Sequence, residues 1–287
     1  ITQNWLVPAL ALLILIDLIP VDKRYVNDDD FVSARQMDRP FQPNAADQQI
    51  LQDDAHYRVF DVSGSPFNTG RTSYFHNAIG GYHAAKPGRM QDLYDFYISQ
   101  NNMEILNMLN AKYFIVPSEG GQPQAQQNPN AFGNAWFVKD IIWVESANEE
   151  ILNLNEVDLQ NTAVINSEFK NEVSEDFKAT ENAEIQLQSY QPNELVYETN
   201  ASSPQFAVFS EMYYQPGWQA YLDGEEVDHV RANYVLRAMN IPAGEHTVTF
   251  RFEPEVVNTG SSIALASSII LVLIILGGFY YKSRKRE

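Results

Sequence analysis

The sequence contains no cysteine among its 287 residues, which excludes disulfide bonds, thiolate–metal sites and cysteine nucleophiles. Basic residues are also scarce: 19 Lys and Arg stand against 37 Asp and Glu, for a formal net charge of −18. Four of the basic residues lie in the last six positions. Because so acidic a surface repels phosphate backbones, the composition argues against nucleic acid as a partner.

Common catalytic motifs are missing as well. The sequence has no Walker loop, no dinucleotide-binding glycine fingerprint, no Gly-x-Ser-x-Gly elbow and no His-Glu-x-x-His. The five histidines do not have the spacing of metal ligands, so we predict no metal site and no evident cofactor. Asp28-Asp29-Asp30 could bind a divalent cation, but no loop glycine or distal glutamate accompanies it. We interpret this triplet as a solvated charge run.

A long apolar run, residues 261–281, carries no charge and precedes the basic tail 282–287. At about 1.5 Å per residue it is roughly 30 Å long, the thickness of the hydrocarbon core of a bilayer. It predicts a transmembrane helix over residues 260–281, against the alternative of a buried soluble helix. Because basic flanks stay inside, the tail is predicted to be cytoplasmic and the preceding residues extracytoplasmic.

A second apolar run, residues 5–19, starts close to the beginning of the sequence. A signal peptide is its main alternative, but no basic region precedes it and no small-residue cleavage site follows. We predict a transmembrane helix over residues 1–20, truncated at its start, as part of a larger protein. Both runs then give one topology: a multi-pass protein of the bacterial inner membrane whose main domain is extracytoplasmic.

The segment between the two runs divides into three parts. Residues 21–50 are predicted to be an exposed linker. Residues 51–175 mix strands and helices and predict a small extracytoplasmic α/β domain: a strand at 56–62, two short helices within 88–110, strands at 113–116, 135–144 and 162–165, and a helix at 148–155. Residues 118–134 are rich in Gly, Gln, Pro and Asn and are predicted to be a flexible excursion.

Residues 176–257 change in character. Seven short strand-like runs at about ten-residue spacing predict an extracytoplasmic β-sandwich, and Asp223-Gly224 predicts a type I′ hairpin turn. The strands are expected at 183–190, 194–199, 205–212, 218–222, 226–231, 234–239 and 246–252. The predicted fold class is therefore membrane-anchored α+β, with an α/β unit and an all-β sandwich flanked by two transmembrane helices.

Two aromatic segments are candidate binding sites. Residues 74–83, which include Tyr82 and His83, could line a polar ligand site that faces the membrane, or form a glycine turn packed on a sheet. Residues 213–221 include Trp218 and Tyr221, whose rings could stack on sugars. The odd separation of these two residues predicts opposite faces of one strand, so that at least one of them has a structural role.

Three segments carry a family resemblance: GGYHAAKPGRMQDLYDFY, LNMLNAKYFIVP, and YYQPGWQAYLDGEEVDHVRANYVLRAMNIPAGEHTVTFRFEP before the last apolar run. Over most of residues 55–281 the chain resembles the C-terminal portion of the bacterial membrane protein YfhO family. Several motif residues match the family pattern and are expected to form turns and pack in the sandwich: Gly81, Tyr82, Trp218, Asp223, Arg231, Asn233, Gly244 and His246. We take Tyr82, His83, Trp218, Tyr221 and Arg231 as the candidate ligand-binding residues.

The resemblance implies a many-helix inner-membrane protein related to GT-C glycosyltransferases, which use polyprenyl-phosphate sugars. The expected partners are the lipid bilayer, a polyprenyl-phosphate sugar, and an envelope glycan or glycopolymer; the complete enzyme could require a divalent cation. The catalytic acid of such enzymes lies in an early extracytoplasmic loop, so no catalytic residue is expected in this chain. The alternatives are a non-catalytic ectodomain that binds glycans or lipid head groups or acts as a scaffold, and, less favoured, a sensor.

Overall fold

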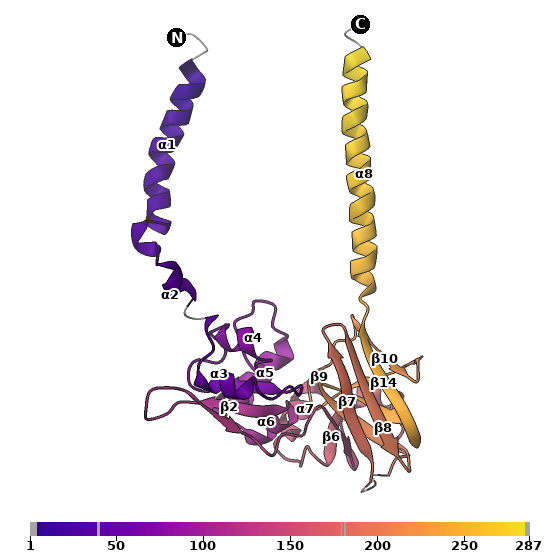
Figure 1. Ribbon diagram of the computed structural model, residues 1–287. Helices are drawn as coiled ribbons and strands as arrows, with labels where there is room; N and C mark the ends of the chain where they lie inside the picture. Colours follow the sequence, from indigo (N-terminus) through magenta and orange to yellow (C-terminus); the bar gives the residue numbers. More distant parts are fainter. Residues whose placement is uncertain (1–4, 39–40, 179, 181, 285–287) are drawn as a thin grey trace.

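The computed structural model describes residues 5–38, 41–178, 180 and 182–284. Three β-sheets and several short helices form the folded part, and a long helix projects from it near each end of the chain (Figure 1). The α+β class predicted from the sequence is confirmed, with a large region rich in β-sheet.

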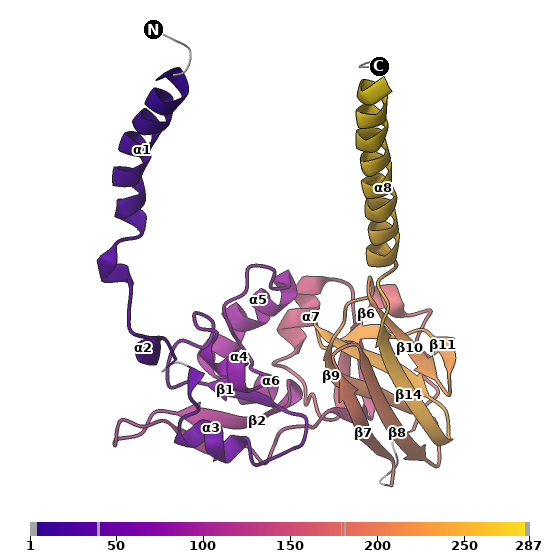
Figure 2. The same cartoon turned by 45° about the horizontal axis from the view of Figure 1, so that its top comes forward.

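The two projecting helices are α1 (Leu6–Tyr25) and α8 (Glu255–Arg284). They leave the folded part on the same side (Figure 1, Figure 2). In the described part of the chain one helical stretch, Glu255–Lys282, is long and apolar enough to cross a membrane. Helix α1 continues beyond the predicted end at residue 20 through Asp22, Lys23 and Arg24. Residues 1–4 of the first predicted span lie outside the described residues.

The segment predicted to be an exposed linker differs from that expectation at its C-terminal end. It contains a 3-10 turn, η2 (Asp28–Asp30), and two helices, α2 (Ala34–Asp38) and α3 (Ala45–Ile50). Helix α3 buries Ala46, Asp47 and Ile50. Its start is set by a capping box in which Asn44 and Asp47 bond each other's backbone N–H groups. The buried face of one short helix is too brief a pattern to read from sequence.

A three-stranded sheet lies in the N-terminal half of the folded part. Its strands are β1 (Arg58–Asp61), β2 (Ala111–Val116) and β3 (Gln124–Gln127), in the order β1-β2-β3. Strand β3 lies inside the predicted flexible excursion, where antiparallel pairing with β2 overrides the polar composition. Three short helices precede β2: α4 (Arg71–Phe75), α5 (Gly88–Phe96) and α6 (Met103–Met108). The last two confirm the predicted helix pair, and a 3-10 turn, η4 (Ile98–Gln100), lies between them.

A six-stranded sheet joins residues from both sides of position 176. Its order is β4-β9-β13-β12-β6-β5. The predicted single strand 135–144 breaks at Lys139, and its two halves pair at opposite edges of this sheet. The bounds are β4 (Ala135–Val138), β5 (Asp140–Val144), β6 (Thr162–Asn166), β9 (Gln205–Met212), β12 (Val230–Ala232) and β13 (Leu236–Ile241). Helix α7 (Ala147–Asn153) connects β5 to β6, and a 3-10 turn, η5 (Ser167–Phe169), follows β6.

A five-stranded sheet completes the fold, in the order β11-β10-β14-β8-β7. Its strands are β7 (Glu184–Gln191), β8 (Glu194–Ala201), β10 (Trp218–Leu222), β11 (Glu225–Val227) and β14 (Gly244–Phe252). The predicted strand 226–231 is thus divided between this sheet and the six-stranded one. The predicted turn is present, with φ of 52° at Asp223 and 88° at Gly224.

The six-stranded sheet is buried on both faces because its strands alternate between two apolar clusters. Phe206, Val208 and Leu236 pack toward the helices, whereas Ala207, Phe209 and Ile241 pack against the five-stranded sheet. Residues before and after position 176 therefore share one continuous core.

Candidate functional site

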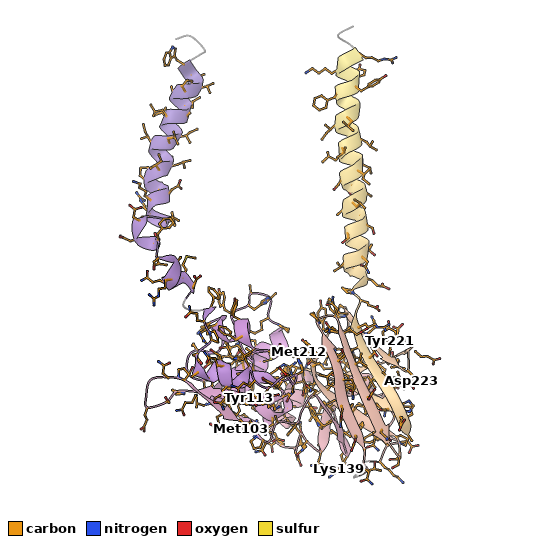
Figure 3. The ribbon with its side chains drawn as sticks, in the orientation of Figure 1. Met103, Tyr113, Lys139, Met212, Tyr221 and Asp223 are labelled. Carbon is orange, nitrogen blue, oxygen red and sulfur yellow. The ribbon has the colours of Figure 1, made fainter. Side chains whose placement is uncertain are left out.

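A cavity of about 330 Å³ lies beneath the loop that joins α4 to α5. We call residues 78–87 the glycine loop. The floor of the cavity comes from β9 and β13 of the six-stranded sheet, and Met212 lies where the helical part meets the sheets (Figure 3). The apolar side chains that line it are Phe67, Ala78, Ile79, Ala85, Pro87, Met90, Leu109, Met212 and Leu236.

The shape of the glycine loop requires its two consecutive glycines. Gly80 has φ of 131° and Gly81 has φ of 96°, a region that side chains with a Cβ rarely adopt. A Cβ at Gly80 would lie 2.3 Å from the carbonyl oxygen of Pro66, the same oxygen that accepts a 2.7 Å hydrogen bond from Gly81 N. Ile79 N donates to Val59 O on β1. The loop is therefore held closely over the cavity.

The charged lining of the cavity has one sign. The charged residues that line it are Arg58 and Lys86, and none of the described lining residues is acidic, in a chain with almost twice as many acidic as basic residues. The Lys86 ammonium lies 4.9 Å from the centroid of the Phe67 ring and 5.8 Å from that of Tyr94. No carboxylate of the described chain lies within ion-pair distance of Lys86, so its charge is open to an anion.

Arg58 also lines the cavity. Its guanidinium donates to the carbonyl oxygens of Leu109 and Ser210 and pairs with Glu211 Oε1 at 3.1 Å. Burial alone would raise the pKa of Glu211, but Arg58 and the hydrogen bond to His56 hold it below the ordinary value. These partners therefore hold Arg58 in place in the cavity wall.

The two candidates in the glycine loop lie at or beside the cavity. Tyr82 is 79% exposed and points away from the core. His83 lines the cavity, and its Nδ1 accepts a hydrogen bond of 3.1 Å from Ala85 N. Sequence reasoning selected this loop by its aromatic and glycine content. It missed Lys86, although this lysine lies within the same motif, and it missed Arg58, whose place in the cavity depends on contacts distant in sequence.

The two aromatic candidates of β10 lie on opposite faces of the strand, as their odd separation predicted. Trp218 packs into the apolar cluster between the sheets, with the Arg237 guanidinium 4.1 Å from its ring centroid. Tyr221 faces outward, donates a 2.8 Å hydrogen bond to Glu253, and lies with Asp223 at the outer edge of the five-stranded sheet (Figure 3). Neither residue lines the cavity.

Arg231 has ionic partners within the protein. Its guanidinium pairs with Glu168 at 2.7 Å, and its Nε lies 3.6 Å from the fully buried Glu150. Its guanidinium also lies over the Phe169 ring, 5.2 Å from the centroid, within the roughly 6 Å range of cation–π contacts. These contacts give Arg231 a structural role between β12 and the elements beside it.

Two other polar regions bear on binding. The Asp28–Asp30 triplet forms part of a capping box with Asn27, and the described residues contain no group of three His, Asp or Glu side chains placed to hold a metal ion. A hollow of about 530 Å³ lies on the outer face of the five-stranded sheet. Its lining is mostly polar: Glu184, Gln186, Gln188, Glu198, Thr199, Asn200, Asp223, Glu245, His246 and Thr247.

The fold is a β-rich α+β domain followed by one helix that is long and apolar enough to cross a membrane. The family model described as Bacterial membrane protein YfhO matches residues 148–264, and this match supports membership of the chain in the YfhO family, as the motif series predicted. The family and the apolar helix support a membrane location and association with the lipid bilayer. The glycine loop lies outside the matched range. No curated protein and no solved structure matches the chain.

Proposed function

We propose that this chain is the C-terminal ectodomain and last membrane helix of a polytopic YfhO-like protein. The whole protein would be a GT-C-type glycosyltransferase that uses a polyprenyl-phosphate sugar in cell-envelope glycosylation. The YfhO family match carries this proposal, and the apolar helix that follows the matched sheets supports it. The catalytic acid would lie upstream, in an early loop outside this chain.

The proposed topology places residues 51–257 outside the cytoplasm. In its support, α1 and α8 leave the folded part on the same side, and Lys282 and Arg284 follow the apolar stretch of α8 (Figure 2). A cysteine introduced at Asn148, an exposed position on α7, tests this arrangement in a chain without native cysteine. Labelling of intact cells by a membrane-impermeant maleimide is expected, and labelling that requires lysis would overturn the topology.

The transfer activity is tested on the complete protein reconstituted in lipid vesicles. With a polyprenyl-phosphate sugar and an envelope glycopolymer, sugar transfer is expected, and substitution of the acidic residue of the early loop should abolish it. Equal incorporation of sugar by the wild-type and substituted proteins would contradict the proposal.

The second candidate function is a non-catalytic module that binds glycans or lipid head groups. The polar hollow on the outer face of the five-stranded sheet favours it, because amide, carboxylate and hydroxyl groups there can bond sugar hydroxyls. None of the five candidate residues lines this hollow, but Tyr221 lies on the same face of the sheet, two residues before Asp223, which does; Tyr82 and His83 belong to the glycine loop. Titration with envelope glycans should give saturable binding that Tyr221→Ala weakens and Tyr82→Ala does not. No binding by the wild-type chain would remove this function.

A further inference from the structure

Three exposed aromatic side chains lie on converging segments around α4. Phe41, Tyr74 and Tyr82 are 55%, 61% and 79% exposed. The Phe41 and Tyr74 rings meet edge to face, with centroids 4.9 Å apart. Tyr82 is next to Gly81, which approaches α4 so closely that a Cβ there would lie 2.8 Å from the Ser73 hydroxyl oxygen. Because single exposed aromatics are ordinary but a group of them is not, we treat these three side chains as one feature and call them the aromatic patch.

The segments beneath the aromatic patch are fixed, so the exposure of its rings is a property of the fold. The buried Thr72 of α4 donates its hydroxyl to Asp61 at 2.8 Å. His76, directly after α4, has its Nε2 3.1 Å from an oxygen of the fully buried Asp47. These contacts hold one side of the short helix inward and leave Tyr74 on the other side. The paired glycines fix the adjacent glycine loop.

The aromatic patch lies on the side of the folded part that is nearest to the membrane. Helix α4 and the start of α5 lie on the side from which α1 and α8 extend (Figure 1, Figure 2). Helix α8 begins at Glu255 and its uncharged run at residue 261, so the hydrocarbon boundary lies only about 9 Å beyond the first residue of α8, at about 1.5 Å per residue. The head-group layer occupies roughly 5–8 Å of that interval. This side of the domain therefore faces the lipid head groups at close range.

The chemistry and the size of the aromatic patch favour a lipid surface over a protein partner. A tyrosine ring can enter the apolar boundary while its hydroxyl stays among water and head groups, which is why tyrosine is enriched at membrane interfaces. Three aromatic side chains bury about 150–250 Å² each, roughly 600 Å² in all, when they are fully covered. A stable protein–protein interface covers about 800 Å² on each partner. The patch is smaller than that, but α8 tethers it beside the bilayer, so that a small contact is sufficient.

We infer that the aromatic patch inserts into the head-group layer and is a second point of contact between the folded part and the bilayer, besides α8. Helix α8 continues from the five-stranded sheet, whereas the patch belongs to the helical part, so that the two contacts hold different ends of the domain (Figure 1). Together they set the tilt of the domain on the membrane and keep the glycine loop at its surface. The inference rests on the membrane location in the proposed function, but it requires neither a particular side of the membrane nor sugar transfer.

The test uses the chain with both projecting helices in phosphatidylcholine nanodiscs. Because the chain has no native cysteine, Ala84→Cys and Met103→Cys each take one nitroxide spin label. Ala84 is exposed in the glycine loop, and its label leaves all three rings in place. Met103 is the control, because it is exposed on the side of the folded part away from the long helices (Figure 3). The ratio of collisions with oxygen, which concentrates in lipid, to collisions with a water-soluble nickel chelate should be several-fold higher at position 84 than at position 103.

Matched variants test the rings themselves. With the label at position 84, the double variant Tyr74→Ser and Tyr82→Ser should lower the collision ratio several-fold, toward the value at position 103, because it removes two interfacial anchors. Met103→Ser removes an exposed apolar side chain from the opposite side and should leave the ratio unchanged. Thermal unfolding midpoints verify that each variant is folded.

The outcomes separate this inference from the proposed function. A ratio at position 84 no higher than at position 103, or one that the double variant does not lower, would overturn the membrane contact. A label at position 84 that is shielded from both reagents would overturn it as well, because the loop would then lie against protein. Docking with these variant effects, in a complete protein that transfers no sugar, would leave the contact standing and remove only the glycosyltransferase.

Discussion

Two turns of the family motif series have similar backbones but differ in burial. The comparison shows how burial decides how much of the fold a turn holds together. The inner turn joins β12 to β13 and contains Asn233 and Tyr234, with φ of 49° and 71°. The outer turn joins β10 to β11 and contains Asp223 and Gly224, also with positive φ. Their backbones are alike, but the inner turn bonds to three other elements of the core, whereas the outer turn bonds mainly to β14 at the surface.

The inner turn is bonded on several sides. Asn233 Oδ1 accepts from Val164 N at 2.9 Å, and Asn233 N donates to Val164 O at 2.8 Å. Tyr234 N donates to Glu150 on α7 at 3.1 Å, and the Tyr234 hydroxyl donates to Asp92 on α5 at 2.7 Å. The turn thus ties residues after position 176 to β6, α7 and α5, which lie before it.

The outer turn has shorter-range bonds. Asp223 Oδ1 accepts from Thr247 N at 2.8 Å, and its other oxygen pairs with His246 Nδ1 at 2.7 Å. The Asp223 side chain is 51% exposed, so water competes for both bonds. Gly244, with φ of 126°, begins the strand on which His246 lies. The motif here organises one surface hairpin.

The largest expected effect is the loss of the carboxylate beneath the inner turn. Glu150 is fully buried and pairs with Arg89 at 2.9 Å. Glu150→Ala should reduce the free energy of unfolding by about 3 kcal/mol, because it leaves charged and backbone donors without their partner. Chemical denaturation in detergent measures it. Glu168→Ala is the control. Glu168 pairs with Arg231, which also lies beside Glu150, but its side chain is 56% exposed, so this substitution should cost less than about 1 kcal/mol. Equal losses would contradict the role of burial.

The second largest expected effect is the loss of stability in acid that the burial of His229 causes. Burial lowers its pKa to about 4, so the folded state holds this side chain neutral while the unfolded chain protonates at its usual pKa of 6.5. The unfolded state then binds more protons between these values, and the stability falls by up to about 3 kcal/mol as the pH drops from 6.5 to 4. In His229→Phe, the free energy of unfolding should depend less on pH across this range. An unchanged slope would show that other groups cause the acid sensitivity.

A direct comparison of the turns gives a smaller effect. Asn233→Ala should cost about 2 kcal/mol, because it leaves Val164 N without its acceptor and because alanine tolerates positive φ less well than asparagine does. Asp223→Ala should cost about 1 kcal/mol or less, because its bonds are exposed. Denaturation curves of the two variants measure the difference. A greater loss at Asp223 would reverse the ranking of the two turns.

The smallest effect is the titration of the outer pair. The hydrogen bond that His246 donates to Asp223 raises the pKa of His246, and the bonds that Asp223 accepts from Thr247 N and His246 lower the pKa of Asp223. The His246 contribution is complete below its unfolded pKa and is lost as the pH rises through its raised folded pKa. The Asp223 contribution is present above its unfolded pKa and is lost as the pH falls through its lowered folded pKa. NMR titration should therefore show a lower His246 pKa in Asp223→Asn, and an unchanged value would exclude the pair as its cause.

Much of the local structure was predictable because its signals are short-range. The alternation over β1, the apolar spacing of α5 and α6, and the Asp223-Gly224 turn all depend on neighbours within a few residues. Strand β3 and the break at Lys139 were missed because each depends on pairing with distant strands. The candidate site follows the same division: the glycine loop was recognisable, whereas Arg58, Met212 and Leu236 reach the cavity only through the fold.

By itself, the sequence determined the apolar C-terminal helix, the positions of most turns, the α+β class and the family resemblance, because composition and short spacing encode them. Only the tertiary structure decided that strands from both sides of position 176 share one sheet, that one turn is buried and its counterpart exposed, and that basic side chains meet an apolar cavity. These features arise where segments distant in the chain bury each other's surfaces, and no local pattern specifies which segments will meet.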